Sequence, residues 1–465
     1  MPNSATLLAD FLCGPGARGI PAPALAHGRR AFLNWMGCSL GAASHQAVDA
    51  LLGSLNDMGT LRNTMVIGRG RTADMQHAAL INATTSSILA FDDTHRDTVT
   101  HPTGPVAAAL LAYAEHYPLS GRDFLSALVL GIEIECRLSN ALSRSPADYN
   151  VGWYLTGVTG AAGAAAALGV AMRLDPTAMI HALGLGALQG AGFRQAHGSM
   201  CLGFVPGHAA RAGVLAAFMA KNGFTCSAEV FEGKNGFFDV FGKKPVRELL
   251  TENLGGCWEV EQNLCKPYPA GIFIHAAIDA CLDVRLKQSL APADIESVRL
   301  VVHPLGVGLT GRAAPKDTIE ALVSIYHWAA VSLLTGRAGI AEVTDERVRD
   351  SEVVALRARI VAVADPALAR DEALIIVTTT DGRELKAHIA HALGGPDRPL
   401  GDAEVAAKFL VQAETVIPRK QADRIVALCA DLDHLSDMRE IIDLLATGEG
   451  RGVTAGNRAA AGVQA

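Results

Sequence analysis

The spacing of apolar residues changes twice along the chain, and this change limits the possible folds more than any other feature. Apolar residues recur at helical spacing in residues 23–40, 72–89, 105–116, 120–142, 156–172 and 176–190. Residues 295–302 instead alternate in a strand-like way, and residues 359–363 and 373–379 are rich in β-branched side chains. Asp381-Gly382 predicts a hairpin turn after the last of these strands. Helical spacing returns in residues 403–410, 422–431 and 437–445.

This order predicts a mainly α protein with an α+β second domain. Both chain ends, residues 1–268 and 396–450, are expected to form one large all-helical domain, with a smaller α+β domain at 269–395 inserted between them. Half of the residues are hydrophobic, which suffices for a large core, and abundant Ala and Gly let helices approach closely. The Gly-, Ala- and Arg-containing tail at 451–465 is expected to be disordered.

Charge and cysteine usage limit the possible partners and compartment. The formal net charge is −7 and there is no basic block, which argues against binding to nucleic acid. The nine cysteines are odd in number and show no CxxC spacing, which favours a reducing compartment. Residues 1–12 lack the basic start of a signal peptide, and the apolar stretch 158–170 is too short to span a membrane. We therefore expect a cytoplasmic protein that does not associate with membranes.

Four segments carry side chains suited to acid–base chemistry. The first holds Asp92, Asp93 and Thr94, followed by His101 in a His-Pro-Thr-Gly sequence. Two carboxylates, a hydroxyl and an imidazole within ten residues suit proton transfer next to a bound carboxylate. The alternative is a solvated loop whose aspartates form an Asx-type turn.

The second and third segments are rich in glycine. Trp153 and Tyr154 precede a Gly-rich helix start, where free N–H groups favour a carboxylate and Tyr154 can act as a general acid. On the residues alone, the alternative that both aromatics are core residues is favoured. Residues 190–207 form a predicted loop in which Arg194 can clamp a carboxylate, with His197 and Met200 nearby. An ordinary interhelical loop remains the alternative for this segment.

The fourth segment is Lys266-Pro267-Tyr268-Pro269. A partly desolvated lysine in a Pro-rigid turn has a lowered pKa and can serve as a base or as a carboxylate ligand, whereas a surface lysine is the alternative. The chain has no phosphate loop, no dinucleotide fingerprint and no His/Cys cluster with metal-ligand spacing, so neither a cofactor nor a metal is predicted.

Taken in order, these segments resemble the MmgE/PrpD family over nearly the whole chain. The resemblance rests on Phe91-Asp92-Asp93-Thr94, His101-Pro102-Thr103-Gly104, Leu130-Gly131-Ile132-Glu133, Thr156-Gly157, Met200, Gly207-His208-Ala209-Ala210, residues 231–238, Lys266-Pro267-Tyr268-Pro269 and Leu400-Gly401-Asp402-Ala403-Glu404. It implies a homodimer with an active site in the cleft between the two domains. It also implies an enzyme without cofactor that removes or shifts a proton next to a carboxylate of a small di- or tricarboxylate.

The resemblance carries over to His101, to Asp92, Asp93 and Thr94, and to Lys266. Three positions depart from the family pattern: Tyr154 and Val205 replace histidines, and Leu202 replaces a lysine. Because a carboxylate without a cation in a cleft is costly, these changes favour a less charged substrate, or one held by Arg194.

The leading hypothesis is a cofactor-independent lyase of the hydro-lyase type. Its catalytic residues are His101 or Lys266 as base, Tyr154 as acid and Asp93 as the group that orients His101. The substrate-binding residues expected beside them are Asp92, Thr94, Arg194, His197, Met200 and Tyr268. The alternatives are an epimerase or isomerase with Tyr154 facing Lys266, and a catalytically degenerate homologue that binds a carboxylate or a partner.

Overall fold

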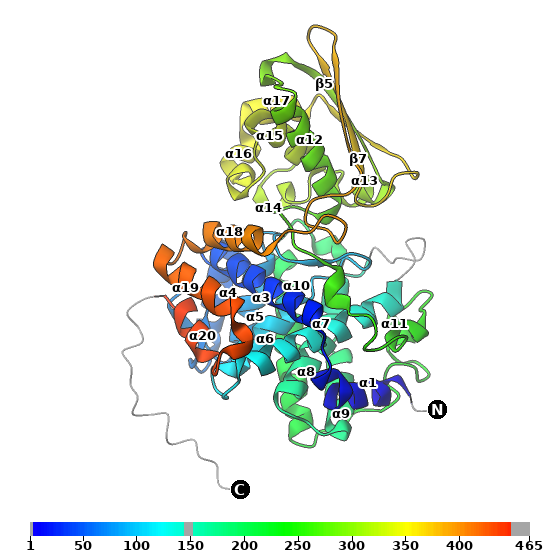
Figure 1. The fold of residues 1–465 in the computed structure, drawn as a ribbon, viewed down its shortest axis with the longest axis vertical. Coiled ribbons are helices and arrows are strands. Elements are labelled where there is room, and N and C mark those ends of the chain that lie inside the picture. Colours follow the sequence, from blue (N-terminus) through cyan, green and yellow to red (C-terminus); the bar gives the residue numbers. More distant parts are fainter. Residues whose placement is uncertain (1–2, 144–151, 448–465) are drawn as a thin grey trace.

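A computed structural model describes residues 3–143 and 152–447 as two lobes joined at a narrow junction (Figure 1). The larger lobe is helical and the smaller lobe combines helices with a sheet, which confirms the predicted fold class. The tail predicted at 451–465 lies outside the described residues.

The larger lobe contains the first part of the chain and its C-terminal helices. Its helices are α1 Ser4–Cys13, α2 Pro15–Arg18, α3 Ala22–Gly41, α4 Gln46–Met58, α5 Met75–Ser87, α6 Thr103–Ala114, α7 Gly121–Ser143, α8 Leu155–Ala171, α9 Pro176–Ala187, α10 Cys201–Lys221, α11 Phe237–Phe241, α18 Asp402–Ala413, α19 Arg419–Ala430 and α20 Arg439–Leu445. The chain returns through α18, which packs against α3 (Figure 1). One apolar core joins both chain ends, with Trp35, Phe409 and Ile441 all buried in it.

Small residues let the central helices of this lobe approach closely. At Gly131 of α7, an added Cβ would lie 2.8 Å from the carbonyl oxygen of Gly163 on α8 and 2.7 Å from the Cβ of Ala167. No side chain larger than hydrogen fits there without moving a helix. The prediction that small residues allow close helix packing is confirmed at the contact between α7 and α8.

The smaller lobe is built on a four-stranded sheet. Its strands are β5 Ile295–Val302, β6 Ile360–Ala364, β7 Ala373–Thr379 and β8 Glu384–Ile389, and its helices are α12 His275–Lys287, α13 Pro304–Thr310, α14 Thr318–Ala321, α15 Ile325–Thr335, α16 Asp345–Arg349 and α17 Ser351–Arg357. The strand order is β6-β5-β7-β8, with β5 parallel to β6 and antiparallel to β7. The predicted hairpin is confirmed, because Val377 pairs with Leu385 and Gly382 adopts a φ of +84° in the turn.

The sequence-based prediction of helices and loops was wrong at two places. Residues 72–74 are not helical: residues 71–73 form strand β2, which pairs with β1 Thr64–Val66, and Asp74 caps α5 by accepting from the backbone N–H groups of Gln76 and His77. Helix α10 begins at Cys201, so the second half of the predicted loop 190–207 is helical and contains Pro206. Glycine and proline in this segment favour a loop, but burial of Leu202 and Val205 against the smaller lobe stabilises the helix instead.

Helix α10 is also long and apolar enough to cross a membrane by length and composition alone. Two thirds of its most apolar window is buried inside the protein, as is typical of a core helix.

Candidate active site

A cavity of about 280 Å³ lies at the junction of the two lobes. Six of the predicted site residues line it: Asp92, His101, Tyr154, Arg194, His197 and Lys266. Residues of the smaller lobe, among them Phe273, Thr310 and Arg312, close the opposite side. The cavity therefore joins segments that lie far apart in the sequence.

A short strand pair brings the first and last of these segments together. Strand β3 Thr94–His95 pairs with β4 Asn263–Leu264, which places Asp92 next to Lys266. His95 is fully buried, and its Nε2 lies 2.9 Å from the carboxylate of Glu259, which fixes the same two segments. Because Asp92 and Asp93 are each only 2% exposed, the alternative of a solvated loop is wrong.

The imidazole of His101 is held in one tautomer and is neutral. Its Nδ1 lies 2.8 Å from the carbonyl oxygen of Asp93, which can only accept, so Nδ1 carries the hydrogen and Nε2 is left as an acceptor. Burial lowers the pKa of His101 to about 4 despite the opposing effect of Asp92, whose Oδ1 lies 3.6 Å from Nδ1. A neutral imidazole with a free Nε2 is a competent general base.

Lys266 is buried rather than on the surface, with 1% of its area exposed. Its Nζ donates to the carbonyl of Ala90 at 3.0 Å and lies 3.4 Å from Oδ1 of Asp92. Burial lowers the pKa of Lys266, and the carboxylate of Asp92 counteracts this by favouring the charged form. Ala90 has a φ of +50°, a strained backbone that directs its carbonyl at the ammonium.

A second lysine, Lys408, which was not predicted from the sequence, joins the segment of Asp92 to the segment of Lys266 by hydrogen bonds. Nζ of Lys408 on α18 donates to the carbonyls of Phe91 and Lys266 at 2.7 and 2.8 Å and to Oδ1 of Asn34 at 2.6 Å. The same ammonium lies 3.7 Å from the centre of the Phe91 ring. Lys408 therefore fixes the position of Lys266 from the C-terminal part of the chain.

Tyr154 stands between two imidazoles in the cavity wall. Its ring makes edge contacts with His101 and His197, with centroid distances of 5.9 and 4.6 Å. Burial raises the pKa of Tyr154 well above its ordinary value, so its hydroxyl keeps its proton. Burial and the charge of Arg194 lower the pKa of His197 to about 3, and its Nε2 is buried without a hydrogen-bond partner among the described residues.

Arginines from both lobes face the cavity. Arg194 donates from Nε to the carbonyl of Trp153 at 3.1 Å, and burial lowers its pKa to about 10. Arg312 of the smaller lobe was missed by the sequence analysis, because it follows a helix that showed no motif. The guanidinium of Arg312 packs closely on Gly198: a Cβ added at Gly198 would lie 2.4 Å from Nη1 of Arg312. That Nη1 is buried and forms no hydrogen bond with the described residues, although Glu320 lies 3.6 Å away.

Four predicted residues do not line the cavity. Asp93 contacts His101 only through its carbonyl, while its carboxylate accepts from Thr103 and Asn263, and burial raises its pKa to about 7. Thr94 lies behind the imidazole, with its hydroxyl 3.1 Å from Nδ1. The hydroxyl of Tyr268 donates to Asp279, and Met200 is 37% exposed.

Packing explains the two positions of α10, Leu202 and Val205, that depart from the family pattern. Leu202 lines the cavity, and both Leu202 and Val205 belong to the apolar cluster that forms the core of the smaller lobe. In this chain, apolar contact across the junction takes the place that the family resemblance assigns to a lysine and a histidine.

Within the described ranges, one group of side chains has metal-ligand spacing. Ligand atoms of Asp371, His391 and Asp397 lie within 4.8 Å of one another on the smaller lobe, and none of these residues lines the cavity.

The fold and the site define a two-domain, mainly helical protein with acid–base groups and cations gathered where its domains meet. Residues 6–249 match the MmgE/PrpD N-terminal domain and residues 268–433 match the MmgE/PrpD C-terminal domain, so the chain belongs to the MmgE/PrpD family.

Curated relatives cover most of the chain at low identity. The chain is 25% identical over 408 residues to the cis-aconitate decarboxylase of Aspergillus terreus, covering 82% of this chain and 83% of the relative. It is 27% identical to the human cis-aconitate decarboxylase, covering 79% of each chain. It is also 27% identical to the 2-methylcitrate dehydratase of Cupriavidus necator, covering 90% of this chain and 92% of the relative.

Proposed function

We propose that this protein is a lyase that acts on a small di- or tricarboxylate by removing a proton from the carbon next to a carboxylate. The observation that carries the proposal is the convergence of His101, Tyr154 and Lys266 on one cavity beside two arginines. Relatives named as a decarboxylase and a dehydratase support the reaction class. Of these two outcomes we favour loss of water.

The reaction divides between a base and an acid. Nε2 of His101 takes the proton from carbon, and the electrons of the broken C–H bond form a carbon–carbon double bond. The bond to the neighbouring hydroxyl breaks, and that hydroxyl leaves as water after receiving the proton of Tyr154. The products are an unsaturated carboxylate and water, and the protons on His101 and Tyr154 return to their starting positions through solvent.

Cations must stabilise the charge that develops during this step. When the proton next to a carboxylate is removed, that carboxylate becomes a dianion, and donors fixed around it supply much of the reduction in barrier. We assign this role to Lys266, and we assign to Arg312, which lines the cavity from the smaller lobe, the binding of a second carboxylate of the substrate. Because Leu202 replaces a cation in the wall, the site favours a substrate that places its charge toward the arginines.

The test is turnover of a panel of hydroxylated di- and tricarboxylates, followed by the absorbance of the new conjugated double bond. His101→Asn should lower kcat by roughly 10²–10⁴-fold, the usual contribution of a general base. Lys266→Ala should lower kcat/KM, and Lys420→Ala, at an exposed position of α19, should change neither.

Running the same panel in deuterated water separates the alternatives. Deuterium in recovered substrate of inverted configuration, with no alkene, would replace the lyase by an epimerase. Full turnover by His101→Asn would remove the proposed base. An absence of turnover together with ligand-induced thermal stabilisation would identify a carboxylate-binding homologue instead.

A further inference from the structure

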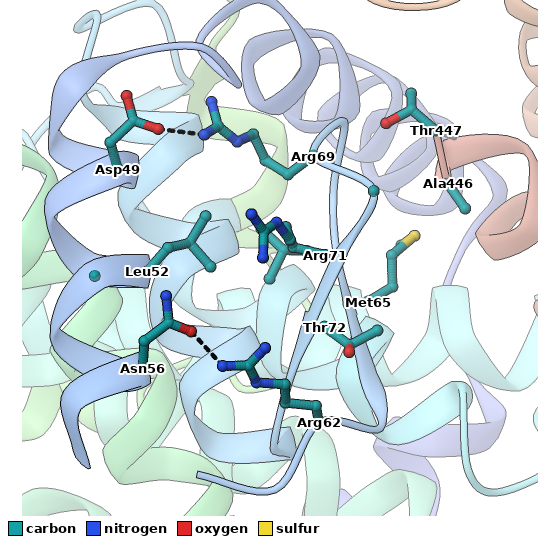
Figure 2. A pocket seen from close by; sticks show the side chains of 13 residues that line it. Asp49, Leu52, Asn56, Arg62, Met65, Arg69, Arg71, Thr72, Ala446 and Thr447 are labelled. Atoms are coloured by element: carbon teal, nitrogen blue, oxygen red, sulfur yellow. Dashed lines mark hydrogen bonds and ion pairs between the residues drawn. The ribbon is translucent and has the colours of Figure 1, made fainter. Parts of the chain in front are cut away.

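A second cavity, separate from the junction, gathers three arginines on the larger lobe. Its volume is about 390 Å³, and it lies between helix α4 and the β1–β2 hairpin, beside Ala446 and Thr447 (Figure 2). Its cations are Arg62, Arg69 and Arg71. In a chain with a net charge of −7, three guanidinium groups around one cavity are a marked local excess of positive charge.

The hairpin and the helix hold these side chains in a row. Figure 2 shows Arg69, Arg71 and Arg62 along the side of the cavity that faces α4, with Arg71 in the middle. Arg69 pairs with Asp49 and donates to the carbonyl of Ala43 at 3.0 Å. Arg62 donates to the side-chain oxygen of Asn56. The two outer guanidinium groups are thus tethered to α4 and its preceding turn.

The middle arginine has no such tether. Arg71 is exposed, and its guanidinium group makes no hydrogen bond or ion pair with any residue in the described parts of the chain. Among the described residues that line the cavity, Asp49 is the one carboxylate, and it balances one of their three positive charges. Mutual repulsion of the guanidinium groups is relieved when an anion with two or more charges enters.

We propose that this cavity binds a small molecule that carries a phosphate or diphosphate group. Guanidinium forks match phosphate oxygens in a bidentate manner, and three of them suit a group with several oxygens and charges. Thr72 of β2 is a further polar residue in the lining of the cavity. Leu52 and Met65 add apolar surface for the rest of the ligand, and the volume exceeds that needed for a lone phosphate.

Gly53 of α4 provides a way to fill the cavity without changing its charge. A Cβ added at Gly53 would meet no atom within 4 Å, so a longer side chain there extends into open space. Gly53→Met should therefore occupy the cavity, and the better helix propensity of Met should maintain or raise the melting temperature.

The experiment is calorimetric titration of the full chain with inorganic pyrophosphate at low ionic strength. Binding is expected for the unaltered protein, with an affinity that falls as salt is added. Arg71→Gln and Gly53→Met should each weaken binding at least about tenfold. Arg122→Gln, at an exposed position of α7 outside the cavity, is the matched control and should bind as the unaltered protein does.

Two further arms exclude other origins of the signal. Arg312→Gln alters the junction cavity, so a loss of pyrophosphate binding in this variant would place the ligand there and overturn the proposal. Citrate that binds as tightly as pyrophosphate, with the same loss in Arg71→Gln, would replace the phosphate assignment by a carboxylate one. Unchanged binding in both Arg71→Gln and Gly53→Met would show that the arginine cavity is not the site.

Discussion

One backbone carbonyl determines which nitrogen of His101 can act as a base. Because the carbonyl of Asp93 accepts from Nδ1, the free lone pair is on Nε2. Neither this geometry nor the low pKa can be inferred from the His-Pro-Thr-Gly sequence. The sequence did indicate which residue types gather at the site, since six of ten predicted side chains line one cavity.

The protonation state of His101 predicts an unusual pH profile. The pKa of the folded group, about 4, lies below the ordinary value of 6.5, so the imidazole stays neutral as pH falls from 7 to 5 and is protonated only near 4. We expect kcat/KM to be nearly constant over that range and to fall with an apparent pKa near 4, measured where circular dichroism shows the protein folded. An acid limb centred near 6.5 would contradict this assignment.

We expect replacement of Arg312 to affect substrate binding, measured as KM, more than the chemical step, measured as kcat. Nη1 of Arg312 is buried at the cavity without a hydrogen-bond partner among the described residues. Arg312→Gln should raise KM by roughly ten- to a hundredfold, the cost of one charge-assisted pair, and should lower kcat less. Arg337→Gln is a suitable control, because Arg337 is largely exposed and pairs with Glu342 outside the cavity. Equal KM values in the two variants would remove Arg312 from substrate binding.

At the scale of elements, regular patterns were predictable and context-dependent ones were not. The strand at 295–302 was predicted with its observed bounds, because Val298, Leu300 and Val302 are buried and alternate with less buried residues. The N-terminal half of α10 was missed, because Gly203, Pro206 and Gly207 favour a loop locally. An added Cβ at Gly207 would lie 2.4 Å from the carbonyl oxygen of Leu80, so glycine is required there by contact with α5.

Helix α18 has a role in the site that its sequence does not indicate. Replacing Lys408 by Met removes three hydrogen bonds and a cation–π contact while keeping a similar length. We expect a destabilisation of about 2–4 kcal/mol and a drop in kcat as Lys266 loses its fixed position. The measurements are thermal unfolding and kinetics beside Lys420→Met, and a variant with unchanged stability and kcat would contradict the role of Lys408.

At the scale of the whole molecule, the exposed stripe of α10 bears on assembly. Phe204, His208, Arg211 and Leu215 recur at helical spacing as its exposed or half-buried residues. Exposed large apolar residues on one helix face are typical of an interface, and the family resemblance implies a homodimer. We propose that a second copy covers this stripe.

The dimer prediction is tested by the mass of the protein in solution. Leu215→Glu places a charge on the stripe and should convert a dimer to a monomer in light scattering coupled to gel filtration. Val411→Glu, at a 73% exposed position of α18, should leave the mass unchanged. A monomeric unaltered protein, or a dimeric Leu215→Glu variant, would refute this arrangement.

The place of Lys408 in the chain has a consequence for synthesis on the ribosome. All the described residues that line the junction cavity have been translated by Val323. Lys408, whose ammonium joins two of their loops by hydrogen bonds, comes 85 residues later. A nascent chain halted between these points holds every proposed reacting group but lacks the clamp that aligns them. The growing polypeptide is therefore expected to stay inactive until its last helices have emerged and folded back.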